Sequence, residues 1–252
     1  MGVKPDRAPG VVPLPPGPGS TPPPPGYSHP MSPSSSRHPS LLLRPTRLRD
    51  VPELIRISRL IYGERGAWKA VELRSHLDRF PEGQFVAQDP RTGHLLGMAV
   101  SLVLRADRWP PDASWRTLTG NGLITTHDPG GETLYAAGVA VAPQARGRGV
   151  GSALYRERET LLKRLGLERI RAGARIPGYG VVAGALSPEA YVEEVVRGMR
   201  TDPTLSFQLA HGFQVVGVAR HYLPADRSSL GHAAVVEWRP KATEGGSSRP
   251  GQ

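Results

Sequence analysis

The sequence predicts an α+β fold, with a mixed, mostly antiparallel sheet that has a central parallel pair of strands and flanking helices. An apolar strand over 134–141 passes through a glycine-rich turn into a helix, and a strand at 169–176 follows. An ordinary crossover makes these two strands parallel. The strands at 84–88 and 94–104 are joined by a short turn, so they are antiparallel. Two further strands, 213–219 and 233–238, complete the sheet.

Before the first hairpin, the sequence indicates one strand and two helices. Leu41–Leu43 is read as the first strand. Asp50 is expected to cap a helix whose apolar residues recur at helical spacing, with Pro52 in its first turn. A second helix is expected over about 69–80. The segment 105–131 is rich in turn-forming residues and is predicted to be one long loop.

The second half of the chain is read in the same way. The helix after the glycine turn is expected from Ser152 to Leu165, with Gly166 ending it. Two further helices open on a cap residue followed by proline, at Ser187 and at Asp202, and are expected to reach about residues 200 and 212. The predicted order is therefore β-α-α-β-β-β-α-β-α-β-β, with the last α standing for both of these helices.

Composition divides the 252 residues into one domain and two tails. Residues 1–40 hold 13 of the 27 prolines and few apolar residues, so we expect this segment to be disordered. The domain is expected over 41–239, and residues 240–252 are expected to form a disordered tail. The absence of cysteine excludes disulfides and thiolate metal sites, and no metal is expected. No apolar run approaches the ~18 residues of a membrane span, and no signal peptide is seen, so a cytoplasmic protein without membrane attachment is expected.

The turn between the central strand and its helix has the chemistry of an anion site. It reads Arg146-Gly147-Arg148-Gly149-Val150-Gly151. Glycines let backbone N–H groups approach an anion at the positive end of the helix dipole. A P-loop would need Gly-Lys followed by Ser or Thr, which is absent, and a dinucleotide fingerprint would need glycine at 152, which is serine. A phosphate-binding loop of another kind and a plain surface loop both remain open.

Net charge also favours an anionic ligand. The chain carries a formal charge of +10, and residues 144–175 contain nine basic and three acidic residues. Such a patch suits nucleic acid or a ligand with a pyrophosphate, such as coenzyme A. The turn has no interleaved aromatic residues for stacking bases, so nucleic acid is the less favoured partner.

The turn resembles the pyrophosphate loop of the GNAT acyltransferase superfamily. The pattern of that loop is Gln/Arg-x-x-Gly-x-Gly/Ala, and its three fixed positions are matched here by Arg146, Gly149 and Gly151. The resemblance continues through 120–129, 174–179 and 202–213, where the chain is similar to GNAT domains often fused to a carbon–nitrogen hydrolase. No hydrolase domain follows within the 252 residues, so amidase chemistry is not expected. The resemblance implies the GNAT fold and acetyl-CoA as co-substrate. The cofactor site would comprise Val139, Ala140 and Val141 along the pantetheine arm, and Arg146, Gly147, Arg148, Gly149, Val150, Gly151 and Ser152 around the pyrophosphate.

Two departures from the family pattern leave the catalytic residues open. The family often has a tyrosine, as acid for the leaving thiolate, where this chain has Gln208, and it often has an asparagine near 173–175, where this chain has none. Glu132 is the first candidate base, followed by His127 and Asp128. The candidate acids are Tyr222, Tyr135 and Tyr179. Each of these residues also has a structural reading, as a turn, loop or core side chain.

Two functions therefore stand side by side. The first is an N-acetyltransferase that moves an acetyl group from acetyl-CoA to an amine acceptor by direct attack in a ternary complex. The second is a non-catalytic acyl-CoA-binding module that regulates a partner. No sequence motif identifies the amine acceptor. The oligomeric state also has no sequence signal, and a homodimer is one possibility.

Removal of residues 1–40 is expected to leave stability unchanged, because this proline-rich segment has no apolar face to bury. Thermal melts of the full chain and the truncated chain should coincide. A fall in Tm of more than about 4 °C, roughly 1 kcal/mol for a domain of this size, would show that the segment packs on the domain.

Overall fold

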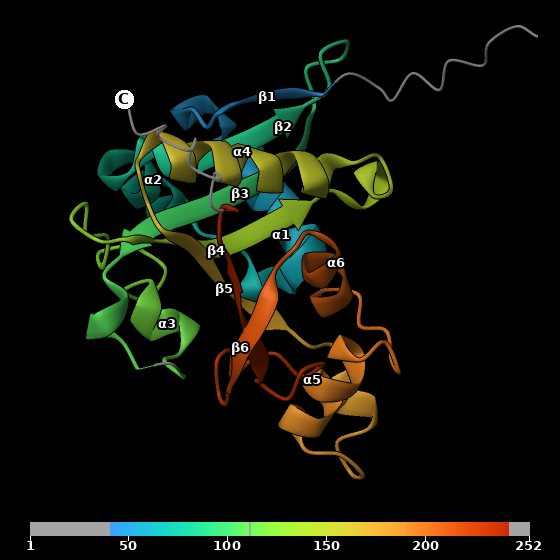
Figure 1. Ribbon diagram of the computed structural model, residues 1–252. Coiled ribbons are helices and arrows are strands. Elements are labelled where there is room, and N and C mark those ends of the chain that lie inside the picture. The colour runs from blue at the N-terminus through green and yellow to red at the C-terminus, as the bar shows by residue number, and fades with distance from the viewer. Residues whose placement is uncertain (1–40, 111, 242–252) are drawn as a thin grey trace, which may run out of the picture. The chain divides into compact units, whose positions relative to one another are not determined.

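The computed structural model describes residues 41–110 and 112–241 of the chain (Figure 1). The segment 1–40 and most of the tail expected at 240–252 lie outside the described residues. The described strands are β1 (Leu42–Pro45), β2 (Gln84–Gln88), β3 (Leu95–Leu104), β4 (Thr133–Val141), β5 (Arg169–Arg175), β6 (Gln214–Ala219) and β7 (Ala233–Trp238). The described α-helices are α1 (Val51–Gly66), α2 (Ala70–Arg79), α3 (Trp115–Leu118), α4 (Val150–Arg164), α5 (Pro188–Val196) and α6 (Leu205–Ala210).

These strands form one mixed sheet in the order β1-β2-β3-β4-β5-β7-β6. β4 and β5 are parallel and are connected through α4, whereas every other neighbouring pair is antiparallel. The predicted α+β sheet with a central parallel pair is thus confirmed. In Figure 1, α4 crosses one face of the sheet, and α1 and α2 lie behind the other face.

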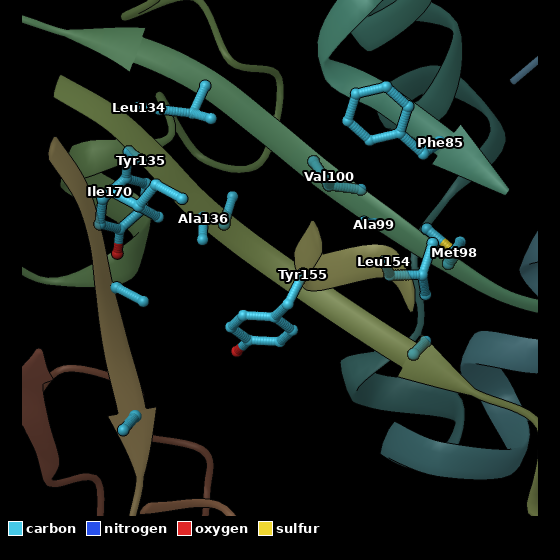
Figure 2. Close-up of a cluster of buried hydrophobic side chains, with 14 of the residues drawn as sticks. Phe85, Met98, Ala99, Val100, Leu134, Tyr135, Ala136, Leu154, Tyr155 and Ile170 are labelled. Carbon is cyan, nitrogen blue, oxygen red and sulfur yellow. The ribbon is translucent and has the colours of Figure 1, made fainter. Parts of the chain in front are cut away.

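The core lies between the sheet and these helices because the central strands β2, β3 and β4 are mostly apolar and buried. All ten residues of β3 are buried, as a central strand covered on both sides requires. Leu154 of α4 is 0% exposed and packs near β3, and Leu134 of β4 and Ile170 of β5 are also 0% exposed (Figure 2). The parallel pair is therefore anchored in the centre of the core.

The glycine turn differs in one detail from its prediction. Helix α4 begins at Val150, two residues before the expected Ser152, because Gly149 adopts a left-handed conformation (φ 76°) and serves as the N-cap. Only glycine takes this conformation without a steric cost. The end of the helix is as expected, since Gly166 follows it with φ 66°.

Three other local predictions need correction. Asp50 does not cap α1, since its carboxylate accepts from the Arg47 N–H and the Arg44 guanidinium. The predicted loop 105–131 contains α3, which is started by the Ser114 hydroxyl accepting from the Thr117 N–H. Helix α5 ends at Val196 rather than near residue 200, and a left-handed glycine follows shortly after it, at 198.

We expect Leu154→Ala to lower the free energy of unfolding by about 2–5 kcal/mol, because it empties space between α4 and the sheet. Urea denaturation at neutral pH measures this. Leu60→Ala is the control, since Leu60 is also helical but 53% exposed, and it should change stability by less than about 1 kcal/mol. Equal losses for the two variants would contradict the described core.

Candidate functional site

The glycine turn presents exposed backbone at the N-terminus of a long helix. Gly147 and Gly149 have φ of 73° and 76°, and a side chain at either position would meet no atom within 4 Å. Both glycines are therefore required by backbone conformation rather than by crowding. The fifteen-residue helix α4 follows at once. Its first N–H groups have no partner within the helix and point toward the turn, which suits an anion.

Side chains around the turn hold it between two other segments. The Arg148 guanidinium lies 3.4 Å from the Asp89 carboxylate, in the connection after β2. Ser152 Oγ lies 2.8 Å from Nε2 of His211, just after α6. Gly151 lies against the Phe207 ring of α6, where a Cβ would come within 3.1 Å of the ring. Arg146, by contrast, is exposed and remains available to a ligand phosphate.

Next to the turn, β4 and β5 separate. Their parallel pairing covers three residue pairs, from Thr133–Arg169 to Tyr135–Arg171. A bulge follows in β4, since Val100 of β3 faces Gly138 and Ser101 faces Ala136, which leaves Ala137 without an opposite residue. Beyond the bulge, the β5-facing edge of β4 has no strand partner. We call this opening between β4 and β5, from residue 136 to residue 141 of β4, the strand gap.

The strand gap exposes particular backbone groups. Ala142 donates its N–H to Leu96 of β3, so the peptide groups of Val139 and Val141, which alternate with it, point away from β3 and toward the gap. The Val139 carbonyl accepts from the Tyr62 hydroxyl of α1 at 2.7 Å. The Ala137 carbonyl accepts from the Trp115 indole of α3 at 2.8 Å. The N–H groups of Val139 and Val141 are the donors on this edge.

Three side chains that sequence reasoning did not select lie at this gap. Tyr62 reaches the Val139 carbonyl, and burial raises the pKa of its phenol to about 12. Tyr155 of α4 points its hydroxyl away from β4 toward β5 (Figure 2) and accepts there from the Gln208 amide at 2.8 Å. Arg158, also of α4, donates to the Gly138 carbonyl at the bulge.

One of these three could have been found from the sequence. Arg158 is four residues after Leu154 and three before Leu161, so helical spacing places it on the same face as these two leucines. A charge on the buried face of a helix is unusual and marks a special environment. Tyr62 and Tyr155, by contrast, look like ordinary apolar-face residues, and nothing local signals their hydroxyl partners.

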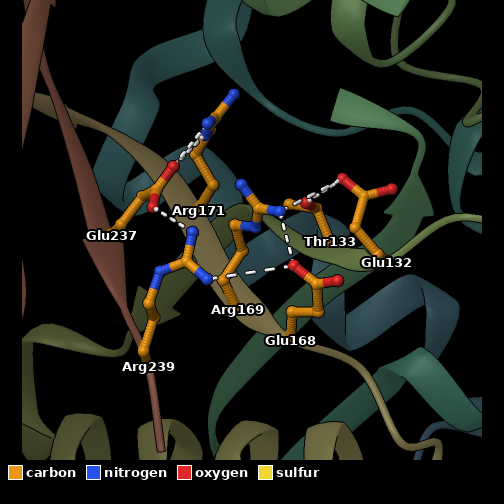
Figure 3. Close-up of polar contacts among 7 residues, drawn as sticks. All are labelled: Glu132, Thr133, Glu168, Arg169, Arg171, Glu237 and Arg239. Atoms are coloured by element: carbon orange, nitrogen blue, oxygen red, sulfur yellow. Dashed lines mark hydrogen bonds and ion pairs between the residues drawn. The ribbon is translucent and has the colours of Figure 1, made fainter. Parts of the chain in front are cut away.

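Glu132, the first candidate base, lies at the opposite end of β4 from the glycine turn. Its carboxylate accepts from Thr133 Oγ1 at 3.0 Å and lies 3.7 Å from the Arg169 guanidinium. Arg169 also pairs with Glu168, which in turn lies near Arg239, within a network of charges at this end of the parallel pair (Figure 3). This arrangement favours a structural role, and the assignment of Glu132 as base stays a prediction.

His127 and Asp128 also lie away from the strand gap. The Val103 N–H donates to Nδ1 of His127 at 3.0 Å, and the Val103 carbonyl accepts from the Asp128 N–H. Both bonds are made to the edge of β3 that pairs with β2, not to the edge that pairs with β4. In the sheet, β3 and β4 therefore lie between His127 and β5. The ring of His127 stacks on Phe80, and burial lowers its pKa, which keeps the imidazole neutral at pH 7. A catalytic role for either residue remains untested.

Of the candidate acids, Tyr222 and Tyr135 lie where the gap begins, and Tyr179 lies elsewhere. The hydroxyls of Tyr222 and Tyr135 share a hydrogen bond, and burial raises the pKa of both phenols well above the ordinary value. The Tyr222 ring covers Gly173 of β5 and lines a small, mostly apolar pocket. Tyr179 donates to the Leu186 carbonyl at 3.2 Å, outside this region. Tyr222 therefore lies near the gap, but its hydroxyl is hydrogen-bonded to the Tyr135 hydroxyl.

The described residues show neither a metal centre nor a membrane span. Within 41–110 and 112–241, no group of three or more histidine, aspartate or glutamate side chains is arranged to hold a metal ion. None of the described helices is both long enough and apolar enough to cross a bilayer.

Comparison with known proteins connects this geometry to a family. A model of the acetyltransferase (GNAT) family matches residues 51–180. YhcX of Bacillus subtilis strain 168, named a probable hydrolase, is 36% identical over 198 residues, which cover 79% of this chain and 38% of that protein. YkwB of the same organism, named an uncharacterized N-acetyltransferase, is 36% identical over 172 residues, covering 68% of this chain and 75% of that protein. The chain thus spans well under half of the first relative and three quarters of the second.

Solved structures show the same fold. The GphF GNAT-like decarboxylase in complex with isobutyryl-CoA aligns with a TM-score of 0.67 at 24% identity, over 79% of this chain and 98% of that one. The loading GNATL domain of CurA from Lyngbya majuscula aligns equally well, with a TM-score of 0.67 at 19% identity and the same coverage. The family match over 51–180, the relatives at 36% identity and the shared fold lead to one conclusion: the chain belongs to the acetyltransferase (GNAT) family.

Proposed function

We propose that the protein is an N-acetyltransferase that transfers an acetyl group from acetyl-CoA to an amine, by direct attack in a ternary complex. The observation that carries this proposal is the adjacency of the glycine turn to the strand gap. The turn offers amides to a pyrophosphate, and the gap offers strand-edge N–H groups to the chain that follows it. The resemblance of YkwB, an N-acetyltransferase by name, supports the same assignment.

The residues present fit such a ligand. Gly147 and Gly149 leave the turn open, and exposed Arg146 can pair with a phosphate. The N–H groups of Val139 and Val141 can hold an extended, amide-bearing arm as an added strand would be held. Bound in this way, the thioester would lie in the strand gap, next to Tyr62 and Tyr155. The acceptor amine would enter from the α1 and α3 side, where Tyr62 and Trp115 lie.

The chemistry then requires positioning and proton removal. An amine with a pKa near ~10.4 is mostly protonated at pH 7 and must lose a proton before it attacks. The thioester carbonyl would accept from a β4 N–H, which stabilises the negative charge that develops on its oxygen. None of the side chains at the gap is an obvious base, so we propose that water carries this proton out. Glu132 and His127 remain the candidates if a side chain is needed.

A non-catalytic acyl-CoA-binding module is the second candidate, and one observation favours it. Gln208, which stands where the family often has an acidic tyrosine, cannot donate a proton usefully, and its amide is already bonded to Tyr155. In that case the ligand would bind without turnover.

We expect the wild type to bind CoA with micromolar affinity, about −7 to −8 kcal/mol, and Gly149→Glu to abolish binding while the fold persists. The glutamate would place a carboxylate where the phosphates bind. Isothermal titration calorimetry measures the affinity, and circular dichroism checks the fold. Gly166→Glu is a matched control, because Gly166 has a similar φ at the other end of α4 and equal free space. It should bind CoA like the wild type.

Thiol release from acetyl-CoA with a panel of amines separates the two functions. Turnover by the wild type, lost in Gly149→Glu and kept in Gly166→Glu, supports the acetyltransferase. Binding without turnover for any amine supports the regulatory module. Wild-type affinity in Gly149→Glu would overturn the location of the site.

A further inference from the structure

One charged side chain of α4 is completely enclosed. Arg158 is 0% exposed, and its guanidinium donates to Ser101 Oγ at 3.0 Å and to the carbonyls of Val100 (2.8 Å) and Gly138. All three acceptors are neutral, and no carboxylate among the described residues forms an ion pair with Arg158. Burial lowers the pKa of Arg158 to about 10, so it is still charged at pH 7. A buried charge without a counter-charge is costly to keep.

This charge lies beside the strand gap. The Gly138 carbonyl that it binds belongs to the bulge of β4, and the next residue, Val139, faces the gap. The guanidinium carbon is 5.5 Å from the centre of the Tyr155 ring, whose hydroxyl points toward β5 (Figure 2). Arg158 is thus one peptide away from the edge groups proposed to hold the thioester.

The other titratable groups around it do not neutralise it. Tyr155 of α4 and Tyr62 of α1 are its electrostatic neighbours, and burial raises the pKa of both phenols, which keeps them uncharged. Arg175 of β5, which acts on Tyr62, is already paired with Asp226. The positive charge of Arg158 is therefore available to an anion that forms in the gap.

We propose that Arg158 is the built-in counter-charge for the thiolate of coenzyme A. This inference rests on the proposed function. In the transfer, the amine nitrogen attacks the carbonyl carbon and a C–N bond forms. The C–S bond then breaks, its electron pair stays on sulfur, and the surplus proton leaves from nitrogen to water. A thiolate stabilised by a nearby charge leaves without a proton donor, which explains how the site works with Gln208 in place of an acid. Arg158 acts through its field and through the β4 bulge, so it is a positioning residue.

The pH dependence of CoA binding tests this proposal without turnover. Free CoA titrates at the ordinary pKa of its thiol, and a nearby positive charge lowers that pKa in the complex. Affinity for CoA should therefore rise with pH between the bound and free values. Acetyl-CoA has no free thiol, so the pH dependence of its affinity reports all other titrating groups. Dividing the CoA affinity by the acetyl-CoA affinity removes their effect. From pH 6 to pH 9, we expect the wild-type ratio of CoA affinity to acetyl-CoA affinity to rise roughly five- to tenfold in calorimetry.

Two arginine variants of the same helix give the comparison. Arg158→Gln should bind both ligands with a flat ratio, whereas Arg156→Gln, which removes an exposed charge from α4, should behave like the wild type. A flat wild-type ratio, or a full rise in Arg158→Gln, overturns the proposal. If Arg158→Gln does not fold, the ultraviolet absorbance of the thiolate in wild-type-bound CoA decides. Thiolate appearing well below pH 8 supports the proposal, and thiolate appearing only near the free value overturns it. Failure of the wild type to bind either ligand would instead overturn the proposed function, and this inference with it.

Discussion

The separation of β4 from β5 is the constraint on which the rest of the site depends. The two strands pair over only three residue pairs, and a bulge at Ala137 then turns the β4 edge into an opening. An open strand edge inside a domain leaves peptide groups without partners, which is costly unless side chains satisfy them. Here Tyr62 and Trp115 donate hydrogen bonds to two of the β4 carbonyls on this edge. Arg158 donates to the Gly138 carbonyl, at the bulge.

These contacts also link stability to function. Arg158 fixes the bulge by tying Val100 of β3 to Gly138 of β4, and it does so with a charge that no described side chain neutralises. A methionine or leucine there would fill the space at lower electrostatic cost, but it would leave the two carbonyls unpaired. In the proposed reaction, the thiolate would be a partner for this charge. The helix that carries Arg158 also begins at the glycine turn, so one element connects the turn with the bulge of β4.

The element order along the chain, the parallel pair and the glycine turn before α4 could be predicted because each has a local signal: apolar strands, a glycine run, and a helix of ordinary crossover length. The helix ends were less predictable, as Asp50 shows by bonding to Arg44 instead of capping α1. The gap residues were mostly missed, because their roles depend on partners far away in sequence: Tyr62 and Val139, Trp115 and Ala137. Glu132 was a candidate base because it directly precedes β4 in the sequence. Its ion pair with Arg169 could not be predicted, because it forms only in the folded chain.

In the proposed complex, an acyl-CoA lies along β4 with its pyrophosphate at the glycine turn. A crystal structure of the wild type with acetyl-CoA would show whether the ligand binds in this way. We expect phosphate oxygens within hydrogen-bond distance of the amides between Gly147 and Ser152, the pantetheine arm bonded to Val139 and Val141, and the thioester in the strand gap. A ligand bound elsewhere on the domain, with the gap closed by Tyr62 and Tyr155, would contradict it.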